Sequence, residues 1–577
     1  MKIQCGILAI LISLLFLSNS KAMRDLYSDT WVATDALTRS LPNFETCGPV
    51  REDRVVGMFY FLWLGQHSKG GPFDITQLLD ANPDKPAWGP VGNFHHWGQS
   101  ELGYYVSDSK YVMRKHWSML QDAGVDVLIF DVTNAFTYDK IYLKLCDLYA
   151  EIRAGGQDTP QICFLTHSNS ALTMTKLYHD FYKPGLHKDL WFLWQGKPLI
   201  LGGGKSLDQE VSDFFTIRDC WAWTHGQDMW NWLDHSKDRY GWHENSEVPE
   251  ELSVSVAQHP ISNIGRSHQG NTQPPHNAHG LTGQEPYGYY FAEQWERALR
   301  VDPEFVFVTG WNEWVAQRFL KKEGQAPGQF LGHALQPGDT YFVDAYNQEY
   351  NRDIEPMLGG HTDNYYYQLI NYVRRYKGVR PTPKATKTYS IHINGNFDDW
   401  HSVEPTFFDT QGDIEHRNEA AWGQIAQYVN QTGRNDIVAS KVAVDTNSVC
   451  FYAHADKTLT AHTDSNWMLL FIDTDQNSIT GWEGYDYLIN GHITAEKTSL
   501  EQWTSEGWVS NGQLDYKTEG HNLEIAIPRT RLNLRPGPVR LDFHWADNVQ
   551  SRDNILEFSF HGDSAPNRRF NYRFVME

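Results

Sequence analysis

From residue 54 to about residue 377 the sequence alternates short apolar runs with amphipathic stretches, and this alternation restricts the possible folds more than any other feature. Such alternation is typical of repeated strand–helix units around a parallel sheet. We predict buried strands at residues 55–64, 125–132, 161–166, 215–223, 252–258 and 305–309, and a helix at 107–123. A region of about 325 residues with at least six strands favours an α/β fold of the (β/α)₈ TIM type over a doubly wound sheet. No glycine-rich phosphate-binding turn follows the first run, so the usual Rossmann signature is missing.

Beyond this region the pattern changes to short, mostly β-branched or aromatic runs. Residues 379–388 are polar and include Pro381 and Pro383, as is typical of a linker. The runs that follow have the spacing of a β-sandwich, and they lie at 390–393, 441–444, 449–454, 468–473, 523–527 and 540–545. We therefore predict a barrel at 23–378, a linker at 379–388 and an all-β sandwich at 389–577.

The first residues are typical of a signal peptide rather than of a folded segment. Lys2 gives a short positive end, residues 7–17 form an apolar run, and Ser20-Lys21-Ala22 has the small-x-small pattern of a cleavage site. The run is shorter than the roughly 20 residues that span a bilayer. We expect residues 1–22 to be removed, leaving an exported protein without a transmembrane segment that is secreted, periplasmic or on the cell surface.

Net charge and aromatic content limit the class of ligand. The chain has 49 basic and 71 acidic residues, a formal net charge of −22, which opposes binding to nucleic acid phosphates. It also has 22 Trp residues, which serve either as core or as platforms that stack on sugar rings. We expect a polysaccharide or oligosaccharide as ligand and no nucleic acid partner.

The strongest candidate for chemistry follows the predicted strand at 305–309. Gly310-Trp311-Asn312-Glu313-Trp314 places a carboxylate at the C-terminal mouth of the predicted barrel, where enzymes of this fold assemble their active sites. Flanking tryptophans would exclude water from the carboxylate and so raise the pKa of Glu313 toward the range of an acid–base catalyst. A strand-end Glu that caps the next helix is the alternative.

This motif resembles glycoside hydrolase family 99 and related WbsX-like barrels. The resemblance rests on Gly310 to Trp314, on Asp353-Ile354-Glu355-Pro356 and on the Tyr-rich stretch at 363–376. It implies a (β/α)₈ barrel acting on glycans, of the retaining endo-α-mannosidase type. Glu313 matches the family's Glu proposed to act on the substrate 2-hydroxyl, which implies a base or a carboxylate that assists the nucleophile. We expect sugar contacts from the neighbouring Trp311, Asn312 and Trp314, and also from Trp63.

The sequence departs from the family at Ala316, where the family has its second acid. Glycosidic cleavage ordinarily needs two carboxyl groups, so the second must come from elsewhere. Asp131, at the end of the run 125–132, is the first candidate, with a helix cap as the alternative. Glu355, Glu349 and Asp344 are further acids; we expect Glu355 and Asp344 to bind substrate if they do not transfer protons.

Two histidines also follow predicted strands. His67 comes after the run 55–64 and His259 after the run 252–258. Histidines at strand ends can hydrogen-bond sugar hydroxyls, and a structural role is as frequent for each.

The C-terminal part resembles the family 9 carbohydrate-binding module and its DOMON-like relatives. The resemblance rests on Ile393-Asn394-Gly395-Asn396-Phe397-Asp398-Asp399-Trp400 and on Phe471-Ile472-Asp473-Thr474-Asp475. Asp473, Asp475 and Asn477 alternate through a turn, with Asp486 downstream, which is an oxygen-rich arrangement suited to calcium. An acidic turn without metal is the alternative, and we expect no cofactor for catalysis.

Together these features predict an exported glycoside hydrolase. Glu313 would act as the base, and Asp131 or an acid between Asp344 and Glu355 would protonate the leaving oxygen. A glycan-binding protein without catalysis is the second interpretation, suggested by Ala316. A polysaccharide lyase is the third, with Arg318 and Arg352 as partners for uronate carboxylates.

Overall fold

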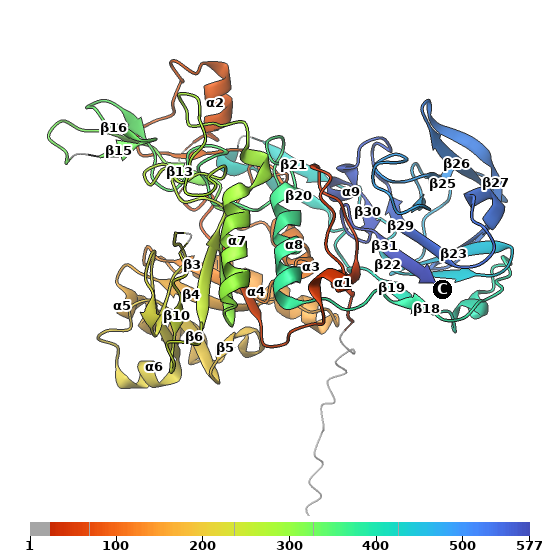
Figure 1. Ribbon diagram of the computed structural model, residues 1–577, viewed down its shortest axis with the longest axis horizontal. Helices are drawn as coiled ribbons and strands as arrows, with labels where there is room; N and C mark the ends of the chain where they lie inside the picture. The colour runs from red at the N-terminus through yellow and green to blue at the C-terminus, as the bar shows by residue number, and fades with distance from the viewer. Residues whose placement is uncertain (1–23, 68–69, 236, 327, 425) are drawn as a thin grey trace, which may run out of the picture.

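The computed structural model describes residues 24–67, 70–235, 237–326, 328–424 and 426–577, so the predicted signal peptide lies outside the described residues. Figure 1 shows a mixed α/β part and a β part side by side, with helices α7 (Tyr289–Val301) and α8 (Asn364–Lys377) upright between them. Within the described ranges, none of the helices combines the length and the apolar character needed to cross a bilayer.

The α/β part contains a sheet that curls into a nearly closed barrel. Its parallel strands follow the order β11-β12-β1-β3-β4-β6-β7-β9. They are β1 (Val55–Tyr60), β3 (Val127–Val132), β4 (Gln161–Thr166), β6 (Lys197–Leu201), β7 (Thr216–Cys220), β9 (Met229–Trp230), β11 (Glu251–Ser255) and β12 (Phe305–Trp311). The edges are bridged by β8 (Gly226–Gln227) and β10 (Gly241–Trp242), and the Asn231 amide donates to Glu251 Oε2 at 3.0 Å. The prediction of strands is confirmed at all six runs.

Side chains along each barrel strand alternate between the interior of the barrel and the outer surface that the helices cover. Phe59, Ile129, Leu165, Leu199 and Phe307 belong to one buried interior cluster. Their neighbours pack against the outer helices α3 (Lys110–Asp122), α4 (Asp139–Ala154), α5 (Ser170–Leu177), α6 (Gln209–Phe214), α7 and α8. The predicted helix at 107–123 is α3, which begins where the Ser109 hydroxyl accepts from the Val112 amide at 3.0 Å.

The segments after β1 and β12 form a small lobe over the carboxyl ends of the strands (Figure 1). Strand β2 (Phe94–His96) from the first segment pairs with β13 (Val315–Gln317) from the second. The same lobe holds α2 (Ile75–Ala81), β14 (Phe319–Leu320), β15 (Gln329–Phe330), β16 (His333–Ala334) and β17 (Thr340–Tyr341). Elsewhere in this part lie α1 (Phe44–Cys47) and β5 (Leu193–Trp194).

The β part, which was predicted as a sandwich, is one sheet curled back on itself. Its order is β18-β31-β29-β24-β25-β26-β27-β28-β23-β22-β19, with β30 beside β29. Phe407 of β19 and Phe451 of β23 lie 5.2 and 5.5 Å from the ring of Phe543 on β29, so distant strands of the order pack face to face. The strands are β18 (Lys384–Ala385), β19 (Thr406–Phe408), β22 (Ile437–Val444), β23 (Ser448–Ala455), β24 (Leu469–Asp473), β25 (Tyr487–Ile493), β26 (Lys497–Thr504), β27 (Gly507–Glu519), β28 (Asn522–Pro528), β29 (Val539–Asp547), β30 (Asp563–Ala565) and β31 (Tyr572–Met576).

Five of the six β runs predicted here are confirmed, but the run at 390–393 is not a strand. The Asn394 and Gly395 amides donate to Glu524 Oε1 at 3.0 and 2.9 Å, so a side chain takes the place of a neighbouring strand. The range predicted as a linker contains β18, which pairs with β31. A separate hairpin, β20 (Arg417–Ala420) and β21 (Gln427–Asn430), and helix α9 (Glu557–Phe560) complete this part.

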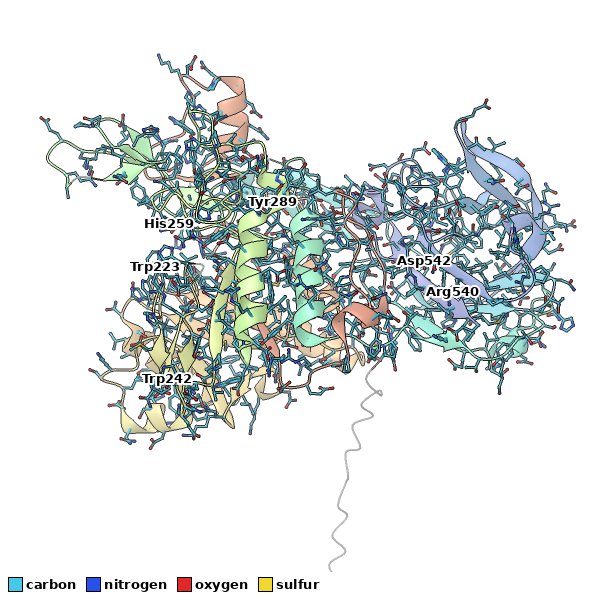
Figure 2. The ribbon with its side chains drawn as sticks, in the orientation of Figure 1. Trp223, Trp242, His259, Tyr289, Arg540 and Asp542 are labelled. Carbon is cyan, nitrogen blue, oxygen red and sulfur yellow. The ribbon has the colours of Figure 1, made fainter. Side chains whose placement is uncertain are left out.

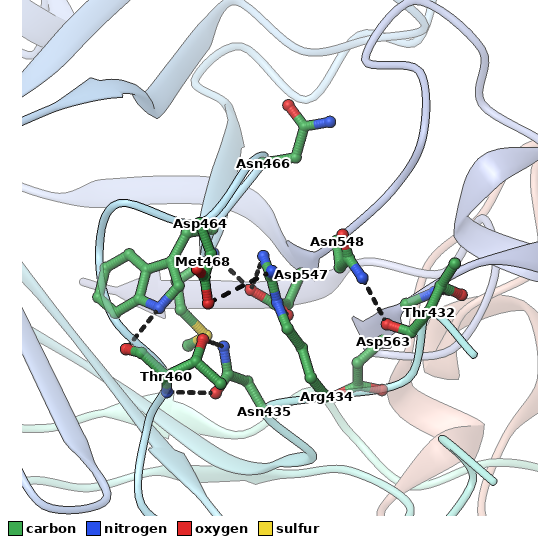
Figure 3. A network of polar contacts seen from close by, with 12 residues as sticks. Thr432, Arg434, Asn435, Thr460, Asp464, Asn466, Met468, Asp547, Asn548 and Asp563 are labelled. Atoms are coloured by element: carbon green, nitrogen blue, oxygen red, sulfur yellow. Dashed lines mark hydrogen bonds and ion pairs between the residues drawn. The ribbon is translucent and has the colours of Figure 1, made fainter. Parts of the chain in front are cut away.

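Buried polar contacts fasten the loops of the β part and join it to the barrel. Figure 3 shows Arg434 beside the buried Asp547, with Nε 2.7 Å from Oδ2, while the Met468 amide donates to Asp547 Oδ1 at 2.9 Å. Between the two parts, both guanidinium Nη atoms of Arg568 contact the Glu101 carboxylate, at 2.5 and 2.9 Å. Such bidentate pairs fix orientation as well as contributing energy.

Candidate active site

The end of β12 is held by a close approach of two backbone segments. Gly310 has φ +120°, and a Cβ at this position would lie 1.2 Å from the carbonyl oxygen of Arg352, so only glycine fits. The Ile354 amide donates to the Gly310 carbonyl at 2.9 Å, and the Glu313 amide donates to Asp353 Oδ1 at 2.5 Å. This approach brings Arg352 beside Glu313.

Glu313 and Arg352 form a buried ion pair. Arg352 Nη2 lies 2.6 Å from Glu313 Oε1 and 2.5 Å from Oε2, and the two residues are only 2% and 4% exposed, respectively. Burial raises the pKa of Glu313 well above its usual range, Arg352 opposes that rise, and the nearby Asp344 and Asp353 charges add to it. The guanidinium also lies over the Trp232 ring, 5.5 Å from its centroid.

Asp344 contacts the same arginine from the solvent side. Its Oδ1 lies 3.7 Å from Arg352 Nη2, and its carbonyl accepts from Nη1 at 3.0 Å. Arg352 Nη2 lies 2.5 Å from Glu313 Oε2 and 3.7 Å from Asp344 Oδ1. The distance between these two carboxylate oxygens therefore cannot exceed the sum of the two distances. That limit admits the separation of about 5–5.5 Å typical of retaining carboxylate pairs.

Asp344, whose side chain is 56% exposed, lines a cavity of about 1020 Å³. Ala316, the position where a second acid was missing from the motif, lines the same cavity. Aromatic and imidazole side chains form much of its wall, namely Trp63, His67, Phe94, Phe136 and Tyr138. An acid open to solvent beside a buried, paired acid is an arrangement suited to proton transfer on a bound ligand.

Asp131 lies at the end of β3 near the same cavity. Its Oδ1 accepts from the Thr133 amide at 3.0 Å, whereas helix α4 begins after Tyr138 without a side-chain cap, so Asp131 is no cap for that helix. Burial raises the pKa of Asp131, and the Asp344 charge adds to the rise. Burial and then the Asp131 charge raise the pKa of Tyr138, which lines the cavity. Asp131 therefore belongs to the electrostatic surroundings of Asp344.

His67 and His259 both lie close to this region. His67 Nε2 is 3.1 Å from the Tyr138 hydroxyl at the cavity wall. The pKa of His259 is lowered to about 4, chiefly by burial and also by the Arg352 charge, while Asp344 opposes the change. Figure 2 shows His259 and Trp223 near each other, and their ring centroids are 6.5 Å apart. His259 is thus a neutral imidazole at neutral pH.

Trp311, Asn312 and Trp314 lie behind the site, buried in the core. Trp311 packs edge-on against His116, with 5.6 Å between ring centroids. The Asn312 side chain accepts from the Phe61 amide and donates to its carbonyl, both at 2.9 Å. Trp314 stacks on Trp97 at 4.6 Å. These side chains hold the end of β12 in place, and none of them presents a face to the cavity.

Glu355 and Glu349 are also fully buried, and each has its own donors. Glu355 accepts from the Ser100 hydroxyl at 2.6 Å, from the Tyr105 hydroxyl at 2.7 Å and from Trp314 Nε1 at 2.6 Å. Glu349 accepts from the Ser267 hydroxyl at 2.7 Å, and burial raises its pKa to about 7. Neither residue lines the cavity, so both are parts of the support beneath the site.

The sequence did not reveal the role of several neighbours of Glu313. Asp353 accepts from Trp97 Nε1 at 2.9 Å as well as from Glu313, and burial raises its pKa to about 7. The sequence suggested Arg352 only as a partner for uronate carboxylates, whereas in the fold it pairs with Glu313. The available signal was Gly310, since a glycine that ends a buried strand indicates close backbone approach.

In the β part, three of the four predicted calcium ligands come together. Asp473, Asp475 and Asp486 each offer an oxygen within 4.8 Å of the others. Asn477 Oδ1 instead accepts from the Ile479 amide at 3.2 Å. Burial raises the pKa of Asp473 to about 7, followed by the charge of Asp542.

Comparison with known protein-family models gives no match, and neither does comparison with curated proteins. The structure is similar to two structures of the GH99 endo-alpha-mannosidase from Bacteroides thetaiotaomicron. They have TM-scores of 0.31, identities of 16% and 14%, and cover 57% of this chain and 98% and 99% of theirs. It is also similar to a carbohydrate binding module family 9 from Caldicellulosiruptor kristjanssonii, with a TM-score of 0.18, 11% identity, and coverage of 33% of this chain and 94% of that one. TM-scores this low do not establish a shared fold.

Proposed function

We propose that this chain is an exported glycoside hydrolase with a (β/α)₈ barrel, whose active site is the cavity at the carboxyl end of the barrel strands. One observation carries the proposal: Glu313 and Asp344 meet on one nitrogen of Arg352, with Asp344 facing an aromatic-lined cavity. Paired carboxylates beside a sugar-sized cavity are what glycosidic cleavage requires.

The exposure of the acids divides their roles. Among the acids between residues 344 and 355, Asp344 alone lines the cavity, so it is the group that protonates the leaving oxygen and later accepts a proton from water. Glu313 is buried, which raises its pKa, and Arg352 opposes that rise by favouring the charged form of the carboxylate. It accepts a proton from a substrate hydroxyl or stabilises positive charge at the sugar ring. Asp131, buried at the end of β3, contributes to the electrostatic surroundings of Asp344.

The cavity wall supports binding of a sugar ring. Trp63 and Phe136 offer apolar faces, and His67, Asn134 and Gln66 offer hydrogen-bonding groups beside them. This combination of aromatic faces and polar groups suits a ring that has apolar faces and a rim of hydroxyls. The motif from Gly310 to Trp314 makes α-mannosides the first substrates to test.

The direct experiment incubates the protein and its Asp344→Asn variant with a panel of oligosaccharides and analyses the products. The proposal expects cleavage by the wild type and a loss of at least about 100-fold in the variant, the usual contribution of acid–base catalysis. Binding by the wild type without product would instead support a glycan-binding protein. That second function is favoured by Ala316, which puts a methyl group on the cavity wall.

The calcium site at Asp473, Asp475 and Asp486 stays a prediction.

A further inference from the structure

A second group of carboxylates lies where the β part meets the barrel. Asp409, Asp413 and Asp563 are all buried, and each offers an oxygen within 4.8 Å of the others. Asp409 follows β19, Asp413 lies four residues further on, and Asp563 begins β30. Figure 3 shows Asp563 beside the chain that carries Thr432, Arg434 and Asn435.

Three of the six carboxylate oxygens of this group are buried without hydrogen-bond partners, whereas Asp563 Oδ2 accepts from the Ile437 amide at 2.6 Å and Asp563 Oδ1 from the Ser564 amide at 2.9 Å. Asp409 is 0% exposed, and neither of its carboxylate oxygens has a partner; Asp413 Oδ1 has none either. Asp436 lies at the edge of the group and offers it no hydrogen-bond donor. Its Oδ2 accepts from the Gly412 amide at 2.8 Å, and its Oδ1 is buried without a partner. Buried carboxylate oxygens without donors are costly unless something else binds them.

The nearby arginine side chains are engaged elsewhere. Arg114 pairs with Glu415 at 2.8 Å, Arg568 pairs with Glu101 at 2.5 Å, and Arg24 donates to the Asp409 carbonyl at 2.6 Å, not to its carboxylate. Lys115 lines the same cavity as Asp413 and Asp563, and the charges of these two acids act to raise the pKa of Lys115. Among the described residues, no Lys, Arg or His nitrogen makes an ion pair within 4.0 Å of the three carboxylates.

We propose that Asp409, Asp413 and Asp563 bind one Ca²⁺ ion that fastens the loop 409–413 to strand β30 at the junction of the two parts. Two oxygens on one Ca²⁺ ion, each at about 2.3–2.6 Å, are at most about 5 Å apart, which agrees with the spacing of the three carboxylates. Mg²⁺ requires oxygens at about 2.0–2.1 Å and keeps several waters, so it fits a dry site of this kind less well.

The position of the site gives the ion a structural role. The loop 409–416 packs against helix α3 through the Arg114–Glu415 pair, and Asp122 of the same helix accepts from Asn567 Nδ2 at 2.9 Å. An ion between Asp413 and Asp563 therefore ties together elements that contact α3 from both sides. Its loss is expected to loosen the docking of the β part on the barrel.

The experiment measures thermal unfolding of the full protein after treatment with a chelator, with CaCl₂ or MgCl₂ added back. Asp409→Asn tests the site, and Asp475→Asn is the matched control in the other acidic group. We expect CaCl₂ to raise the Tm of the wild type and of Asp475→Asn by roughly 5 °C or more, with a smaller effect of MgCl₂. Asp409→Asn is expected to lose this rise and, in chelator, to unfold at a higher temperature than the wild type, because one repelling buried charge is gone.

Two results would overturn the proposal. One is an equal response of Asp409→Asn and wild type to CaCl₂; a loss confined to Asp475→Asn would assign calcium to the other group. The second is a wild type whose Tm does not change with CaCl₂. If Asp409→Asn does not fold, Asp413→Asn takes its place, and isothermal titration with CaCl₂ is expected to show one binding event fewer than in the wild type.

Discussion

Arg352 holds the Glu313 carboxylate through a single nitrogen, Nη2, which lies 2.6 Å from Oε1 and 2.5 Å from Oε2. The same nitrogen reaches Asp344 Oδ1 at 3.7 Å. A charge buried at the end of β12 is thereby linked to an acid at the wall of the cavity. Stability and chemistry at this site consequently depend on the same residue.

Removal of the Arg352 charge is expected to destabilise the fold. Arg352→Met leaves Glu313 buried without its partner, which costs about 3–5 kcal/mol in the free energy of unfolding measured with urea. The double variant Arg352→Met with Glu313→Gln is expected to recover much of that loss, since no unpaired charge remains. Equal stability of the single and double variants would show that the pair does not act as a unit.

Phe136 is expected to contribute to glycan binding. It lines the cavity, and 57% of its surface is exposed, so truncation removes an aromatic face without opening the core. Phe136→Ala is expected to weaken oligosaccharide binding by about 1 kcal/mol, roughly five-fold in Kd, with unchanged Tm. Leu172→Ala, at an exposed apolar residue on α5, is the control for titration calorimetry, and an equal effect there would argue against the cavity.

A carboxylate at position 316 is expected to compensate in part for the loss of Asp344. Ala316 and Asp344 line the same cavity, so a Glu at 316 places an acid near the position that Asp344 serves. In the Asp344→Asn background, Ala316→Glu is expected to raise kcat/KM by at least about tenfold, a fraction of the usual acid–base contribution. No gain in a folded double variant would indicate that Asp344 acts otherwise than as a proton donor.

Stability without calcium is expected to fall as the pH rises from 6 to 9. Burial raises the pKa of Asp436 to about 7 and of Asp122 to about 8, well above about 3.9 for an exposed Asp. A carboxyl whose pKa is higher in the folded state favours folding at low pH, and this contribution is lost as the pH rises through about 7 to 8. Urea unfolding in chelator should show this trend, with less of it in Asp122→Asn. A stability that rises over the same range would contradict these assignments.

Six of the barrel strands could be predicted because they lie in clear apolar runs. Strands β6 and β9 could not be predicted. Strand β9 has two residues, and β6 follows Gly196 with Pro198 inside it, so neither gives a recognisable run. The position of Glu313 could also be predicted, from the strand that precedes it. Its partners could not, because Arg352 and Asp344 reach it only through the backbone contact between Gly310 and Arg352.

The tryptophans show the limit of inference from composition. Trp311 and Trp314 flank the key carboxylate in sequence, yet backbone geometry turns both into the core. Trp63, farther away in sequence, lies at the cavity. A sequence pattern indicates which residue types gather near an acid, and the local turn decides which of them face the ligand.

The measurement that tests the central claim most directly is product analysis of oligosaccharides incubated with wild type, Glu313→Gln and the control Glu210→Gln, which alters a surface acid paired with Lys183. All three are expected to stay folded by circular dichroism. The account predicts cleavage products from the wild type and from Glu210→Gln, and none from Glu313→Gln. Undiminished cleavage by a folded Glu313→Gln variant would contradict it.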